Sequence, residues 1–149
     1  MTSLVAGVGS DIMSDDAIGH EVIKALEKAS CECDLAYLGT DIFRLHLHYR
    51  GHERVIVVDA LKGVDPGSVH VFYQDDFHRL DGFIRHSHLL GIIEALNIMS
   101  LITPGLSEAK KIVVGVGAET IQPGMELSPA AKKGVALAVE KIMAILNSQ

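Results

Sequence analysis

The chain has 149 residues, of which 48% are apolar, and its formal net charge is −6 at pH 7. We predict one domain over residues 1–149, because this length suffices for a substantial core. The negative charge disfavours a nucleic-acid binder, which needs a positive surface potential. No apolar run is long enough to cross a bilayer and the first residues lack a signal-peptide pattern, so we expect a cytoplasmic protein without membrane insertion.

The N-terminal part predicts a strand, a loop and a helix. Residues 3–6 are mostly apolar and precede Gly7 and Gly9, which indicates a strand followed by a turn. Apolar residues then recur at helical spacing over residues 18–29.

Cys31 and Cys33 are only two residues apart. We do not expect an ordinary disulfide between them, and reduced thiols fit the cytoplasmic assignment. The pair could instead bind a metal, although the chain has no second pair of cysteines to complete such a site.

The middle of the chain predicts three strands, of which the last differs from the others in its direction. Residues 34–38 form one strand, and residues 54–58 form another that is apolar on consecutive positions, as in the buried strands of parallel sheets. Helical spacing over residues 42–49 lies between them. Residues 69–73 follow Asp59 too closely for a helical crossover, so we expect an antiparallel strand at the sheet edge.

The C-terminal part alternates in the same way. It predicts a helix over residues 88–102, a buried strand over 112–116 and a closing helix that Ser128 and Pro129 introduce. This alternation indicates an α/β fold, a three-layer α/β/α sandwich around a twisted, mostly parallel five-stranded sheet with one antiparallel edge strand.

Three side chains are expected at one edge of this sheet. Asp16 follows the first strand, Asp59 ends a central one and His88 opens a helix. Ligands of open α/β sheets bind at the carboxyl ends of the strands, and two carboxylates with an imidazole suit a divalent metal. Each residue also has a structural alternative, since Asp16 next to Asp15 can cap the first helix, Asp59 can cap a turn and His88 can be structural.

Other chemistries find little support in the sequence. The glycine pattern that begins at Gly7 has Ile12 where a dinucleotide fingerprint needs its third glycine. The serine-hydrolase elbow and the His-Glu-x-x-His motif of zinc proteases are absent. His86 is a neighbouring candidate ligand or proton carrier, with a solvated loop histidine as the alternative.

Taken in order, several segments resemble the hydrogenase maturation endopeptidases over most of the chain. The segments are Gly7-Val8-Gly9, Asp15-Asp16-Ala17-Ile18-Gly19, Val57-Val58-Asp59-Ala60, Pro66-Gly67-Ser68-Val69, His88-Leu89-Leu90-Gly91 and Leu127-Ser128-Pro129.

This resemblance implies an endopeptidase that removes a C-terminal extension from the nickel-loaded large subunit of a nickel-iron hydrogenase. It implies that Asp16, Asp59 and His88 are the catalytic and metal-contacting residues, and that the nickel is carried by the substrate, with no permanently bound cofactor. The expected partner is the hydrogenase large-subunit precursor, and we expect a monomer.

Two loops depart from the family pattern, at Gly39–Ile42 and at Gly117–Thr120. They fit a divergent protease with an unusual client. They also fit a metal-sensing maturation chaperone without proteolytic activity, and a small-molecule hydrolase or nucleotide-binding domain that shares only the sheet is a third alternative.

Overall fold

The computed structural model describes residues 1–79, 89–124 and 126–148. Five strands form one sheet in the order β2-β1-β3-β5-β4. Four strands are parallel and β4 runs antiparallel to β5 at the edge, which confirms the predicted fold class. The strands are β1 (Ser3–Val8), β2 (Asp34–Gly39), β3 (Arg54–Leu61), β4 (Val69–Tyr73) and β5 (Lys110–Gly117).

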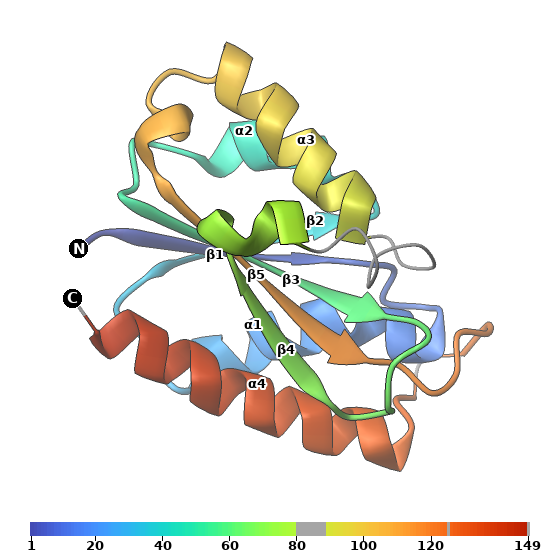
Figure 1. Ribbon diagram of the computed structural model, residues 1–149. Coiled ribbons are helices and arrows are strands. Elements are labelled where there is room, and N and C mark those ends of the chain that lie inside the picture. Colours follow the sequence, from blue (N-terminus) through green and yellow to red (C-terminus); the bar gives the residue numbers. More distant parts are fainter. Residues whose placement is uncertain (80–88, 125, 149) are drawn as a thin grey trace.

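Helices cover both faces of the sheet (Figure 1). The helices α1 (Ile18–Lys28) and α4 (Pro129–Asn147) lie on one face, and α2 (Leu45–His48) and α3 (Leu89–Ile102) lie on the other. Short 3₁₀ helices complete the described part of the chain: η1 (Ser14–Ala17), η2 (Ile42–Arg44), η3 (Gln74–Arg79) and η4 (Leu106–Glu108). No helix among the described residues is long and apolar enough to cross a membrane.

Strand β3 lies at the centre of the sheet and is buried over its whole length. Its alternate residues belong to two apolar cores, because successive side chains of a strand point to opposite faces. Val55 and Val57 pack with the apolar residues of α3, whereas Ile56 and Val58 pack with those of α1 and α4. The chain passes from β1 to β2 on one side and returns to β3 on the other, so the strand order reverses between β1 and β3.

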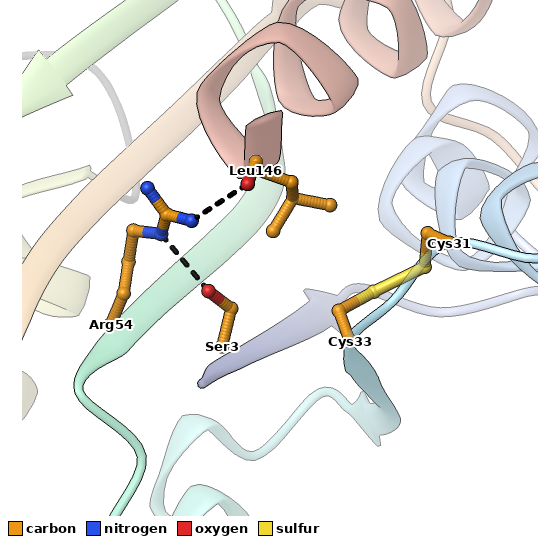
Figure 2. Close-up of a disulfide and its surroundings, with 5 residues drawn as sticks. All are labelled: Ser3, Cys31, Cys33, Arg54 and Leu146. Atoms are coloured by element: carbon orange, nitrogen blue, oxygen red, sulfur yellow. Dashed lines mark hydrogen bonds between the residues drawn. A yellow bond between two sulfur atoms is a disulfide. The ribbon is translucent and has the colours of Figure 1, made fainter. Parts of the chain in front are cut away.

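At the amino ends of the strands, two details stabilise the sheet (Figure 2). Buried Arg54 donates to the Ser3 hydroxyl and to the carbonyl oxygens of Ile145 and Leu146, so it closes the end of α4. Cys31 and Cys33 form a disulfide, so the prediction of no disulfide between them is wrong. The chain bends at this point, and the bend brings the two Cα atoms to 5.6 Å, within the range that a disulfide spans.

Candidate functional site

Asp59 lies inside the central strand, with its side chain on the α3 face of the sheet. The prediction that it ends the strand is wrong, because β3 continues to Leu61 by pairing with β5. Asp59 is 4% exposed, and its Oδ1 accepts a hydrogen bond of 2.8 Å from the backbone N–H of Ala60. Burial raises the pKa of Asp59 to about 8; the Ala60 N–H opposes this rise, and the negative charge of Asp16 adds to it.

Asp16 belongs to η1, the short helix between β1 and α1. Its carboxylate does not cap α1, since the N-cap is Ala17 and no side chain caps that helix. Instead, Asp16 Oδ2 accepts a hydrogen bond of 2.8 Å from the backbone N–H of Ser10. The helix-cap alternative for Asp16 is therefore wrong, and its partly buried carboxylate lies within electrostatic reach of Asp59.

Two glycines allow η1 and the start of α1 to lie against the carboxyl ends of β1 and β3. Gly9 has a φ of +131°, and a Cβ atom there would lie 2.0 Å from the carbonyl oxygen of Asp16. A Cβ atom on Gly19 would lie 2.4 Å from the carbonyl oxygen of Val8 and 2.8 Å from that of Val58. This close approach puts Asp16 at the point where the strand order reverses, the usual binding position in such sheets.

Asp15 fixes η1 to the loop between β5 and α4. Its completely buried carboxylate accepts four hydrogen bonds: from the N–H and hydroxyl of Ser128, both at 2.7 Å, and from the N–H groups of Glu119 and Thr120 at 2.8 and 3.1 Å. Burial acts to raise the pKa of Asp15, but these hydrogen bonds outweigh it and lower the pKa. Asp15 therefore anchors the short helix that carries Asp16. Neither Asp15 nor Asp16 caps α1.

Beside Asp59, a crevice of about 340 Å³ opens between the sheet, η2 and α3. Its walls are mainly apolar, and Asp59 and Glu94 are its acidic groups. The lining residues are Val8, Thr40, Ile42, Phe43, Asp59, Gly91, Ile92, Glu94, Ala95 and Ile98. Thr40 and Ile42 belong to the loop Gly39–Ile42, so this loop forms part of the wall of the crevice.

His88 and His86 lie outside the described residues. Helix α3 begins at Leu89, the residue after His88, and Gly91 in its first turn lines the crevice beside Asp59. Over the described ranges, no group of three His, Cys, Asp or Glu residues could hold a metal ion. The structure thus brings Asp16 and Asp59 together, and the contribution of His88 stays a prediction.

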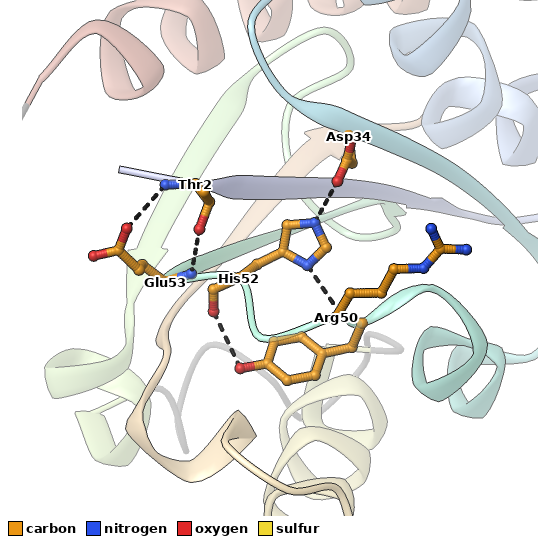
Figure 3. A network of polar contacts seen from close by, with 6 residues as sticks. Thr2, Asp34, Arg50, His52 and Glu53 are labelled. Atoms are coloured by element: carbon orange, nitrogen blue, oxygen red, sulfur yellow. Dashed lines mark hydrogen bonds and ion pairs between the residues drawn. The ribbon is translucent and has the colours of Figure 1, made fainter.

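His52, by contrast, is a buried histidine with a structural role at the opposite end of the sheet (Figure 3). Its Nδ1 accepts from the backbone N–H of Arg50 at 3.2 Å, so the proton of the neutral ring lies on Nε2. Nε2 then donates to Asp34 Oδ2 at 2.6 Å, which ties the loop before β3 to the start of β2.

Sequence reasoning missed the role of Asp15 and the wall formed by η2. The available signal for Asp15 was Ser128, which was predicted as the N-cap of the last helix. The Ser128 hydroxyl does accept a hydrogen bond of 3.1 Å from the N–H of Ala131, and the same hydroxyl donates a hydrogen bond to the Asp15 carboxylate. The Asp15 contacts at Glu119 and Thr120 use backbone N–H groups, so the side chains of this departing loop can vary without loss of those bonds.

Comparisons with known proteins find relatives in sequence and in structure. The sequence profile of the hydrogenase maturation protease family matches residues 20–145. Protein FrxA of Pyrococcus furiosus is 35% identical over 136 residues, which are 91% of this chain and 98% of that protein. The hydrogenase 2 maturation protease of Escherichia coli is 27% identical over 152 residues, 99% of this chain and 92% of that protein.

Among solved structures, the nickel-iron hydrogenase maturation protease HybD from Thermococcus kodakarensis superposes with a TM-score of 0.87 at 33% identity, and the match covers 99% of this chain and 100% of HybD. The maturating endopeptidase HybD from Escherichia coli superposes with a TM-score of 0.77 at 25% identity, over 98% of this chain and 92% of that one.

Proposed function

Because the chain belongs to the hydrogenase maturation protease family, we propose that it removes a C-terminal extension from the nickel-loaded large-subunit precursor of a nickel-iron hydrogenase. In this proposal the protease recognises the nickel of its client through Asp16, Asp59 and His88. The nickel belongs to the substrate, and the protease has no resident cofactor.

The observation that carries this proposal is the environment of Asp59. A buried carboxylate is costly unless hydrogen bonds or opposite charges compensate it. Among the described residues, Asp59 accepts one hydrogen bond, from its own neighbour, and the nearby charge of Asp16 is repulsive. A divalent metal that the client brings into the crevice would relieve both the burial cost and the repulsion, so the loaded client gains binding energy that the empty precursor lacks.

The same contacts would serve the cleavage step. Hydrolysis joins the oxygen of water to the acyl carbon as the C–N bond breaks, and the departing amine takes a proton. Asp16 and Asp59 would hold the metal-bearing segment so that the scissile bond lies at the crevice. If the nickel of the substrate lies against the scissile carbonyl, it would also polarise that group.

The test uses precursor prepared with and without nickel. We expect the wild-type protein to shorten the loaded precursor alone, as seen by intact-mass measurement. Asp16→Asn and His88→Ala should abolish the cleavage and retain the melting temperature, whereas Asp11→Asn, an exposed change in the same loop, should cleave like the wild type. Equal cleavage of the nickel-free precursor would refute the nickel requirement.

Two further results would replace the proposal. Full cleavage by Asp16→Asn or His88→Ala would refute the site assignment. Nickel-dependent binding of a precursor that keeps its full length would instead identify a metal-sensing maturation chaperone.

A further inference from the structure

The outer face of α3 carries large apolar side chains that contact solvent. Ile98, Leu101 and Ile102 are 49%, 86% and 71% exposed. Glu94 is the only charged residue of this helix. A helix that is apolar on all sides is normally covered on all sides, and contiguous apolar surface on a protein commonly marks an interaction site. In Figure 1 this helix belongs to the layer that covers one face of the sheet, and no other described element is drawn on its outer side.

The exposed apolar face is continuous with the crevice. Gly91, Glu94 and Ile98 line the crevice and are spaced three and four residues apart, so they form one stripe of the helix. Leu101 continues the same stripe beyond the crevice. From Gly91 to Ile102 the helix rises about 16 Å. Phe43, which is 41% exposed, adds an apolar side chain from the opposite wall of the crevice.

We propose that Phe43, Ile98, Leu101 and Ile102, together called the α3 surface, dock an apolar surface on the folded body of the client protein beside the segment to be cut. This inference rests on the proposed function. The α3 surface begins at the crevice that holds Asp59, so a protein whose segment enters the crevice is brought against it. A convex helix face suits a folded partner, whereas extended peptides bind grooves and sheet edges.

A second copy of this chain is a poorer occupant. Phe43 and Ile98 belong both to the α3 surface and to the lining of the crevice. A dimer through this surface would therefore cover the entrance to the crevice, and the client would have to displace it.

Leu101→Glu tests the inference, since an 86% exposed side chain can change without disturbing the core. The matched control is Leu137→Glu, a 40% exposed leucine on α4 at the other face of the sheet. Binding of nickel-loaded precursor is measured by biolayer interferometry, and its processing by intact mass. We expect Leu101→Glu to raise the dissociation constant and KM by about tenfold or more, with kcat unchanged, because docking would then bury an unpaired carboxylate in an apolar interface. Leu137→Glu should match the wild type.

Equal binding of precursor by Leu101→Glu and Leu137→Glu would overturn the docking inference and leave the proposed function intact. Failure of the wild-type protein to cleave would refute the proposed function, and the binding measurement would still decide on the α3 surface. Sedimentation equilibrium of the protein alone measures whether the α3 surface mediates self-association. A wild-type dimer that Leu101→Glu dissociates, without an effect on the precursor, would assign the surface to self-association and overturn the inference.

Discussion

Two buried carboxylates, Asp15 and Asp59, have opposite electrostatic properties. Asp15 is completely buried and Asp59 is 4% exposed, so burial penalises the charge of both. Asp15 accepts four hydrogen bonds, and its pKa is lowered. Asp59 accepts one from Ala60 among the described residues and faces the charge of Asp16, and its pKa rises to about 8. Asp15 therefore has four donors that stabilise its charge, whereas Asp59 has one described donor and also faces a like charge.

This difference indicates two roles for acids of the same type. The charge of Asp15 is already stabilised within the fold, so Asp15 contributes to the structure that holds Asp16 in place. The charge of Asp59 is poorly stabilised by the described residues, and a cation would stabilise it, which is the role that we propose for Asp59. The comparison predicts that changes at Asp59 affect processing most and changes at Asp15 affect folding most.

The largest expected effect is on processing. Asp59→Asn keeps the size of the side chain and an oxygen that can accept from the Ala60 N–H, but it cannot lose a proton to become a negatively charged metal ligand. We expect cleavage of the nickel-loaded precursor to fall at least about 100-fold, because loss of one partner of a buried charge contact costs on the order of 2–5 kcal/mol. Single-turnover cleavage measures this change. A variant that cleaves at the wild-type rate would remove Asp59 from the site.

The pH dependence of stability distinguishes the two carboxylates directly. The folded-state pKa of Asp59 is raised above its ordinary value of 3.8, so the unfolded chain loses this proton first and stability falls as pH rises from about 4 to about 8. The shift sets an upper limit of about 6 kcal/mol for the loss. Asp15, whose pKa is lowered, contributes stability that is present above pH 3.8 and is lost in acid.

Urea unfolding of the metal-free protein between pH 4 and pH 9 tests this prediction. We expect Asp59→Asn to flatten the decline and to exceed the wild type in stability at pH 9. Parallel pH profiles for the two proteins would show that Asp59 ionises in the folded state with its ordinary pKa.

A smaller effect is expected at the clamp between η1 and the loop before α4. Asp15→Asn should lower the free energy of unfolding by about 3 kcal/mol at pH 7. The amide NH₂ group would then face N–H and O–H groups that now donate hydrogen bonds to a carboxylate oxygen. Chemical denaturation measures the change, and Asp11→Asn is the exposed control. Adding Ser128→Ala should cost less in the Asp15→Asn background than in the wild type, since the two residues share hydrogen bonds. Additive effects would contradict the clamp.

Local pattern and chain length were sufficient to predict the sheet. The antiparallel β4 followed from the short connection after Asp59, which leaves no room for a helical crossover. Strand ends were less predictable: Gly7 was interpreted as a turn and Asp59 as a strand end, yet β1 reaches Val8 and β3 reaches Leu61. Both extensions come from pairing with neighbouring strands, which a local pattern does not contain.

The candidate site was also predictable only in part, because some of its contacts join residues that are far apart in the chain. The topology of parallel sheets brings the loops after β1 and β3 to one edge, so Asp16 and Asp59 could be expected together. The different roles of Asp15 and Asp16 could not be predicted from the sequence, because the two are adjacent residues of the same type. The difference depends on Ser128, which is 113 residues from Asp15 in the chain. His88 stays a prediction.

The smallest expected effect concerns the disulfide between Cys31 and Cys33, which the structure reveals and the sequence reading missed. The bond closes a loop of three residues, so it restricts the unfolded chain little and should contribute about 1–2 kcal/mol or less. The two cysteines lie just before β2, at the amino ends of the parallel strands, whereas Asp16 and Asp59 lie towards the carboxyl ends. We therefore expect a reductant to lower the urea midpoint slightly and to leave processing unchanged. A protein with both cysteines replaced by serine should be insensitive to the reductant. Loss of cleavage on reduction of the wild type, with activity retained by the serine variant, would trace the loss to chemistry of the free thiols rather than to the stability of this end of the sheet.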